Sequence, residues 1–156
     1  MAKGPTVFTG YLKAPDENRQ AFTRDGYFLT GDLAVITTEG IIKITGRSKD
    51  IIIRGGENIS PAEIESLVRT HPQVADVAVI GMPDAELGER ACAYIVPRKN
   101  ADLTLQTIVA FLRSKGASVL QLPERIEIIS EIPLTNIGKP DKKALRENLK
   151  DRLKNS

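Results

Sequence analysis

Residues that build disulfides and metal sites are almost absent from this chain. It has a single cysteine and a single histidine in 156 residues. One cysteine cannot form a disulfide within the chain, and Cys92 lies in the alternating run ACAYIVP, where a small buried side chain is expected. His71 by itself cannot supply a multi-histidine site, and no spacing of cysteine and histidine indicates structural zinc. The sequence therefore predicts no metal site.

Long apolar runs and aromatic residues are also scarce. No run approaches the length of a membrane span, and the N-terminal MAKGPTVF lacks the apolar core of a secretory signal, so we expect a cytoplasmic protein without a membrane partner. Only 4% of the residues are aromatic, too few for the exposed pairs on which nucleic-acid bases stack. The 22 basic and 20 acidic residues are interspersed. This charge balance does not indicate a nucleic-acid partner.

The first 46 residues have turn signals and short β-prone runs but few apolar residues. The runs 33–38 and 41–45, joined by Glu39 and Gly40, predict a β-hairpin. Segment 6–27 has too little apolar surface to bury itself. We therefore expect residues 1–46 to have no core of their own and to be the tail of a preceding domain.

From residue 50 onward the pattern changes to mixed strands and helices, with 41% hydrophobic residues overall to supply a core. Ser60 and Glu63 form a capping-box pattern around a helix that begins at Pro61. Gly116 is the expected stop of a second helix. The predicted elements are strands at 51–53, 74–80, 90–96 and 125–130, a turn at Pro83-Asp84, and helices from Pro61, Thr104 and about Asp141. The prediction is an α+β domain with a short sheet packed by about three helices.

One lysine stands out because it lies on a predicted loop rather than in a packed stripe. Lys139 follows a glycine and precedes a proline, between the last strand and the last helix. Its three donors can bridge a carboxylate and a phosphate and offset their charge, although most loop lysines are simply solvated. The chain has no GxxxxGK[ST] loop, so a triphosphate would be held elsewhere.

Four further residues allow both a functional and a structural interpretation. Gly55 and Gly56 let an extended ligand pass close to the backbone, or form a plain turn. Arg47 can grip phosphate or ribose oxygens, or form a surface ion pair with Asp50. Asp32 can accept hydrogen bonds from a sugar diol, or cap a turn. Each position judged alone favours the structural interpretation.

Taken together, these motifs match a known order. GYFLTGD (26–32), GRSKDIIIRGGENISPAEIE (46–65) and PLTNIGK (133–139) resemble the last motifs of the adenylate-forming superfamily of acyl-CoA synthetases, peptide-synthetase adenylation domains and luciferases. The intervening residues 71–97 also look like that family. The resemblance covers nearly all of the chain.

The resemblance implies a two-step reaction. A carboxylate attacks the α-phosphate of ATP, bound with Mg²⁺, to give an acyl-adenylate and pyrophosphate, and a thiol, usually that of CoA, then displaces AMP. Asp32 matches the residue that binds the ribose hydroxyls, and Arg47 matches the arginine that assists it. Lys139 matches the lysine that bridges carboxylate and phosphate during adenylation.

The resemblance also implies a mobile domain. Lys49 falls at the hinge about which the C-terminal domain rotates between the two steps, and Gly55 and Gly56 match the loop that lines the pantetheine tunnel. The expected divisions are residues 1–46 as the tail of the N-terminal adenylation domain, 47–49 as the hinge and 50–156 as the C-terminal domain.

The family's triphosphate loop and acyl pocket belong to a large N-terminal domain, and nothing in this chain corresponds to either. We therefore expect the chain to work with its own N-terminal domain on a carboxylic acid, ATP and CoA, and to be inactive alone. One alternative is a module that loads the pantetheine of a carrier protein. Another is a non-catalytic interaction module, against which the retention of Asp32, Arg47 and Lys139 argues.

Overall fold

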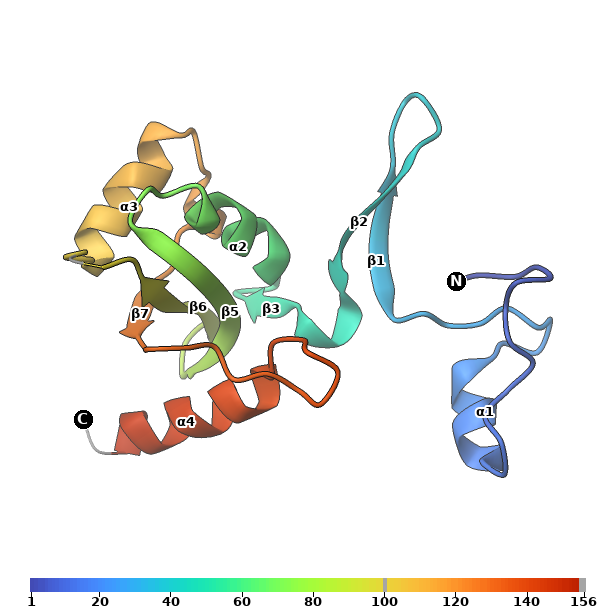
Figure 1. Cartoon of the computed structure of the whole chain (residues 1–156). Coiled ribbons are helices and arrows are strands. Elements are labelled where there is room, and N and C mark those ends of the chain that lie inside the picture. The colour runs from blue at the N-terminus through green and yellow to red at the C-terminus, as the bar shows by residue number, and fades with distance from the viewer. Residues whose placement is uncertain (100, 155–156) are drawn as a thin grey trace. The chain divides into compact units, whose positions relative to one another are not determined.

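The chain divides into two compact units that meet in sequence between Lys49 and Asp50. A computed structural model describes residues 1–99 and 101–154, and Figure 1 shows the elements in order. Each unit is described by itself below. No helix among the described residues is long and apolar enough to cross a membrane.

The first unit contains a short helix and a hairpin. Helix α1 spans Pro15–Ala21, and strands β1 (Asp32–Ile36) and β2 (Ile42–Arg47) pair antiparallel. At the turn, Gly40 has φ +80° and its N–H donates to Thr37 O over 2.9 Å. Glycine takes this conformation without steric cost. The predicted hairpin is confirmed, whereas α1 is an element that the prediction of strands alone missed.

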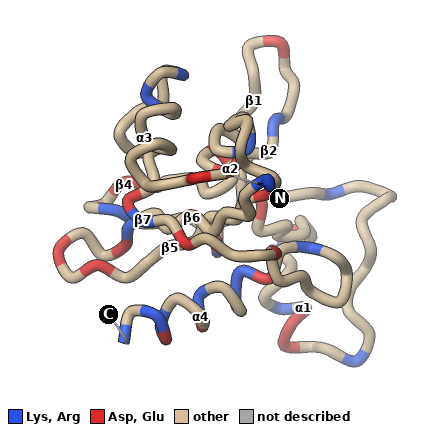
Figure 2. Tube along the Cα trace, turned by 60° about the vertical axis from the view of Figure 1, so that its left-hand side comes forward, with Lys and Arg blue, Asp and Glu red and all other residues tan. Residues whose placement is uncertain are grey.

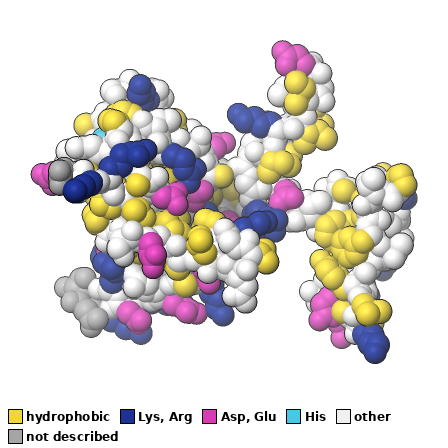
Figure 3. Space-filling view, viewed as in Figure 1, with side chains coloured by type: hydrophobic (Ala, Val, Ile, Leu, Met, Phe, Trp, Pro, Cys, Tyr) yellow, Lys and Arg dark blue, Asp and Glu magenta, His cyan; other side chains and the backbone are white. Residues whose placement is uncertain are grey.

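The first unit has no buried core. None of residues 1–49 is buried. Phe8, Phe22 and Phe28 contact one another with ring centroids 4.9–5.5 Å apart, yet they stay partly accessible. Figure 3 shows hydrophobic side chains on the surface of the hairpin, and its exposed apolar residues are Leu33, Val35, Ile36, Ile41, Ile42 and Ile44. The expectation that this segment cannot bury itself is confirmed.

The second unit is built on one five-stranded sheet. The strands are β3 (Ile52–Arg54), β4 (Glu57–Ile59), β5 (Val74–Asp84), β6 (Gly88–Pro97) and β7 (Arg125–Ile128). The order is β4-β3-β6-β5, and β7 pairs with β6 in parallel while the other pairs are antiparallel. Strand β5 therefore lies at an edge of the sheet.

Three helices cover both faces of this sheet (Figure 1). Helices α2 (Pro61–Arg69) and α3 (Leu105–Ser114) pack on one face, and α4 (Lys142–Lys154) packs on the other. Because successive strand residues point to opposite faces, Val77 and Val79 join the first core, and Ala78 and Ile80 join the second. The predicted α+β domain with three helices on a short sheet is confirmed.

Local signals located most element ends, with some exceptions. Thr104 caps α3 as predicted, since its Oγ1 accepts from Thr107 N over 3.2 Å, and Gly116 follows α3 with φ +80°. Helix α2 begins at Pro61, as predicted. The Ser60 side chain makes no capping hydrogen bond, so the prediction of a capping box at this helix is wrong.

Several strand boundaries also differ from the prediction. Strand β5 continues through Pro83 and Asp84, because Pro83 pairs with Glu89 on β6, and the turn follows at 85–87. Strand β7 ends at Ile128, two residues early, and β4 was not predicted. These ends depend on the pairing partner rather than on the residues of the strand itself.

Candidate functional site

Asp32 and Arg47, two of the three residues that the resemblance assigns to the nucleotide, are in contact. Asp32 begins β1, Arg47 ends β2, and the two are partners in the antiparallel register. Arg47 Nε lies 3.0 Å from Asp32 Oδ1, with side chains 49% and 29% exposed. The alternative pairing of Arg47 with Asp50 is wrong, because Asp50 pairs with Arg146.

A register shift in the hairpin produces this contact. Near the turn Ile36 pairs with Ile42 and Ala34 with Ile44, but a bulge between Leu33 and Ala34 moves the pairing by one residue. Without the bulge, Asp32 would face Gly46 instead of Arg47. β-Bulges are known to redirect side chains next to functional sites.

The backbone around the pair is held from both sides. Ser48 N and Ser48 Oγ both donate to Gly31 O, over 2.8 and 3.2 Å, and Asp32 N donates to Thr30 Oγ1 over 3.1 Å. The ion pair joins Nε of Arg47 to one carboxylate oxygen of Asp32. A carboxylate can accept hydrogen bonds from a diol, and a guanidinium can donate to a phosphate.

Lys49 is the last residue of the first unit. It lies in the 3-10 turn Ser48–Asp50 and is exposed. The boundary between the compact units falls directly after it, at the end of the segment 47–49 for which the resemblance implies a hinge. Rotation about Lys49 stays a prediction.

Gly55 and Gly56 form the two-residue turn between β3 and β4. Their φ angles are +57° and +87°, and Arg54 pairs with Glu57 across the turn. A two-residue hairpin turn of this kind requires positive φ at both positions, which only glycine adopts freely. The structural interpretation of these glycines is confirmed, and their role in lining a thiol path stays a prediction.

Lys139 lies on an ordered loop between β7 and α4. Its N–H donates to Thr135 Oγ1 over 3.2 Å, and its C=O accepts from Thr135 N over 2.7 Å. Gly138 N also donates to Thr135 O over 2.9 Å. The loop is therefore a small hairpin closed by Thr135, and it presents an exposed lysine at its end.

The structure divides the predicted site residues between the two units. Asp32 and Arg47 meet in the first unit, while Gly55, Gly56 and Lys139 belong to the second, on separate loops. Sequence reasoning missed two basic residues that follow Lys139, Lys142 and Arg146, which pair with Glu65 and Asp50. Their spacing of four residues on one helix was the available signal.

His71 and Cys92, the single histidine and the single cysteine of the chain, are both buried. His71 Nδ1 accepts from Gln73 N over 3.2 Å, its ring packs edge-on against Phe111, and burial lowers the pKa of its imidazole. Cys92 is fully buried, as predicted. Burial, reinforced by the nearby Glu127 carboxylate, raises the pKa of the Cys92 thiol to about 12. Within 1–99 and 101–154, no cluster of acidic, histidine or cysteine side chains is placed to hold a metal ion.

We expect the Cys92 thiol to resist alkylation in the folded chain and to react once urea unfolds it, because the thiolate is the nucleophile.

Above a pH of about 9 the unfolded chain loses the Cys92 thiol proton and the folded chain keeps it. The folded state then binds more protons, so this group makes stability fall as pH rises from about 9 toward 12. Urea unfolding of the wild type and of Cys92→Ala across this range measures the effect, and parallel curves would contradict it.

Comparison with known proteins identifies related sequences and structures. A family model described as the AMP-binding enzyme C-terminal domain matches residues 63–139. The 2,3-dihydroxybenzoate-AMP ligase of Bacillus subtilis is 42% identical over 153 residues, which is 98% of this chain and 28% of that protein. The medium-chain fatty-acid–CoA ligase of Escherichia coli is also 42% identical over 153 residues, covering 97% of this chain and 27% of that ligase.

Solved structures give the same result. The crystal structure of ATP-bound MatB from Rhodopseudomonas palustris matches with a TM-score of 0.85 and 38% identity, over 96% of this chain and 29% of that one. The fold of the chain is thus that of the small C-terminal part of MatB and of related enzymes with the AMP-binding C-terminal domain. The chain spans little more than a quarter of the length of the curated relatives described here.

Proposed function

The chain belongs to the adenylate-forming enzymes, and from this membership we propose that it is the C-terminal part of an ATP-dependent carboxylate-CoA ligase. The enzyme joins a carboxylic acid to AMP with release of pyrophosphate, and then transfers the acyl group to the thiol of CoA with release of AMP. The observation that supports the proposal is the contact between Asp32 and Arg47, because a carboxylate can accept hydrogen bonds from ribose hydroxyls and a guanidinium can donate to phosphate oxygens.

Asp32 and Arg47 bind the nucleotide in this proposal. The carboxylate of Asp32 accepts hydrogen bonds from the ribose hydroxyls, and the guanidinium of Arg47 faces the phosphate side. An exposed ion pair adds little to folding stability. The Asp32–Arg47 pair is therefore better explained by a ligand than by the fold.

Lys139 supplies the cation for adenylation. The first step brings an anionic carboxylate onto an anionic phosphate, so a fixed positive charge that bridges both lowers the barrier. The ordered loop closed by Thr135 supports this role, because it holds the lysine backbone without a ligand. The thiol step does not need this charge.

Rotation about Lys49 separates the two steps. After adenylation, the second unit turns so that Lys139 leaves and the Gly55-Gly56 turn approaches the acyl-adenylate, where it lines the path of the pantetheine thiol. The boundary of the compact units after Lys49 supports this pivot. One domain thereby serves two half-reactions.

A preceding domain completes the enzyme. The unburied first unit and its exposed apolar hairpin support a larger partner domain, which would hold the triphosphate and the acyl pocket. No described cluster of side chains fits a metal ion, so we assign Mg²⁺ to the ATP phosphates in that domain. The chain alone is expected to be inactive.

A second candidate keeps the adenylation step but changes the acceptor. The acyl group passes to the pantetheine of a carrier protein instead of CoA. The relative named 2,3-dihydroxybenzoate-AMP ligase favours this candidate, since its name gives the adenylate and not a CoA thioester. The fatty-acid–CoA ligase favours CoA.

Product analysis of the complete enzyme, meaning this chain joined to the preceding domain, tests the proposal. We expect AMP, pyrophosphate and an acyl-CoA when ATP, CoA and medium-chain fatty acids or hydroxybenzoates are supplied. Adenylate that accumulates with CoA but transfers to a pantetheine-bearing carrier protein would favour the second candidate. Formation of ADP and phosphate with every acid would contradict both.

A further inference from the structure

Helix α4 starts three residues after Lys139, and the loop passes directly into it. Asp141 N donates to Pro133 O over 2.7 Å, which closes the base of the loop. The carboxylate of Asp141 accepts from Lys143 N and Ala144 N over 3.1 and 3.0 Å and so caps the helix. Any displacement of the first turn of α4 is therefore transmitted to Lys139.

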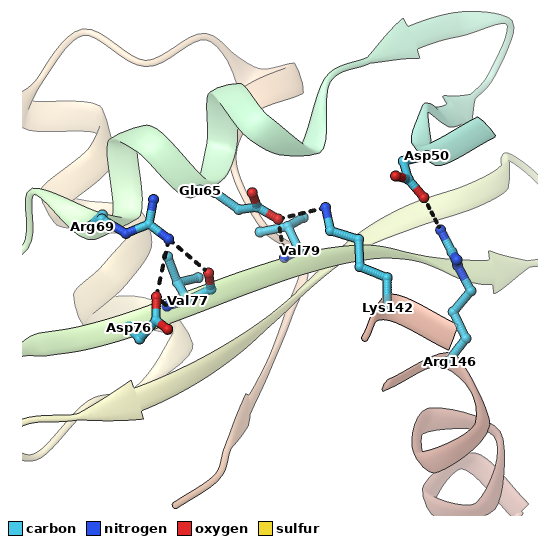
Figure 4. A network of polar contacts seen from close by, with 8 residues as sticks. All are labelled: Asp50, Glu65, Arg69, Asp76, Val77, Val79, Lys142 and Arg146. Atoms are coloured by element: carbon cyan, nitrogen blue, oxygen red, sulfur yellow. Dashed lines mark hydrogen bonds and ion pairs between the residues drawn. The ribbon is translucent and has the colours of Figure 1, made fainter. Parts of the chain in front are cut away.

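The first turn of α4 is held by a half-buried ion pair. Lys142 Nζ lies 2.7 Å from Glu65 Oε1 on α2, and the side chains are only 18% and 16% exposed. Because α2 and α4 cover opposite faces of the sheet, this contact passes around the edge strand β5 (Figure 4). It joins the two helical layers of the unit.

The acceptor of this pair is itself fixed. Glu65 Oε1 also accepts from Val79 N of β5 over 2.8 Å. One turn along α2, Arg69 Nη2 donates to Val77 O over 3.2 Å and pairs with Asp76 (Figure 4). These side chains satisfy backbone groups that an edge strand leaves unpaired. Glu65 is therefore a rigid anchor for Lys142.

A second ion pair lies one turn farther along α4. Arg146 Nη2 lies 3.2 Å from Asp50 Oδ1, with side chains 37% and 21% exposed, although the residues are 96 positions apart in sequence. Asp50 is the first residue of the second unit, directly after Lys49. This pair ties α4 to the start of the unit (Figure 4).

Apolar packing alone does not define the position of α4 along the sheet. Leu145 and Leu149 are buried against β5 and β6, but hydrophobic contact is non-directional. Figure 2 shows that basic residues extend along much of α4. Lys142 and Arg146, in the first turns of α4, reach Glu65 and Asp50, and Arg152 near the end of the helix reaches Glu127 on β7.

We propose that Lys142 and Arg146 are positioning residues that fix α4, and with it the Lys139 loop, to Glu65 and Asp50. The proposal rests on the proposed role of Lys139. Rotation at Lys49 then carries Lys139 as part of one rigid body, because Asp50 is bonded directly to the helix that follows the lysine. Misplacement of a catalytic group by about 1 Å can cost about a hundredfold in rate.

The test uses the complete enzyme and measures the two half-reactions separately. Adenylation is followed by ATP–pyrophosphate exchange, and thioester formation is followed from supplied acyl-adenylate. We expect Lys142→Met and Arg146→Met each to lower kcat for adenylation about ten- to a hundredfold, with the KM for ATP unchanged and thioester formation largely spared. The exchanged pair Glu65→Lys with Lys142→Glu should recover part of the adenylation rate. Lys150→Met, an exposed change on the same helix, is the matched control.

Two results would overturn the proposal. One is adenylation at the wild-type rate by folded Lys142→Met and Arg146→Met enzymes; the other is an equal loss in both half-reactions, which indicates general destabilisation. If Lys142→Met does not fold, Arg146→Met and Glu65→Gln decide. Lys139→Ala in the same assays separates the hypotheses. If this variant adenylates normally, the proposed role of Lys139 fails; if this variant alone is slow, only the positioning role of Lys142 and Arg146 fails.

Discussion

Replacing Lys139 with alanine in the complete enzyme is expected to slow acyl-adenylate formation by about two to three orders of magnitude. That is the usual loss when one preorganised electrostatic donor is removed from a developing charge. Thioester formation from supplied acyl-adenylate should change little, because that step does not bring two anions together. Pyrophosphate exchange and acyl transfer, measured separately, provide the two rates.

The structure supplies suitable comparisons for this variant. Lys139 is exposed and only its backbone is held by Thr135, so alanine should leave the fold intact and thermal unfolding should not shift. Lys150→Ala removes an exposed lysine from α4 as a control. Equal losses in the two half-reactions of Lys139→Ala would contradict a role confined to adenylation.

Replacing Asp32 with alanine is expected to raise the KM for ATP in adenylation about ten- to a hundredfold. Hydrogen bonds to a charged group contribute about 1.5–3 kcal/mol, and about 1.4 kcal/mol corresponds to a factor of ten. The variant also leaves Arg47 without the carboxylate that lies 3.0 Å from its Nε. Titration of ATP in the exchange assay measures the change.

Stability should respond far less than nucleotide affinity to this substitution. The ion pair is 49% and 29% exposed, and exposed pairs contribute about 0–1 kcal/mol. Asp16→Ala, which removes an exposed ion pair with Arg19 in the same unit, is the control and should leave the KM unchanged. An unchanged KM in Asp32→Ala would mean that the pair only joins β1 to β2.

Where the sequence predicted the fold well, the cause was a local conformational requirement. Gly40, Gly55, Gly56 and Gly116 all have positive φ, a condition that few residues besides glycine meet. Pro61 fits the first turn of a helix and no other part of it. A few adjacent residues therefore suffice to predict a turn or the start of a helix.

The candidate site was predicted less completely. Motif order identified Asp32, Arg47 and Lys139 as site candidates, but the bulge that sets Asp32 opposite Arg47 and the pairs made by Lys142 and Arg146 were missed. Asp50 was one alternative partner considered for Arg47, yet it pairs with Arg146. Charged side chains are long, and their partners are decided by which elements pack together.

The sequence by itself determined the family, the α+β class, the unburied first segment and the glycine turns, because each follows from composition, ordered motifs or local backbone geometry. Only the tertiary structure decided which charges meet. Lys142 finds Glu65 77 residues away, and Arg146 finds Asp50 96 residues away. Burial of Leu145 and Leu149 on the sheet brings α4 close to these residues that are distant in sequence. The hydrophobic effect that drives this burial does not specify polar partners. The packing of α2, α4 and the start of the second unit around one sheet brings those partners together.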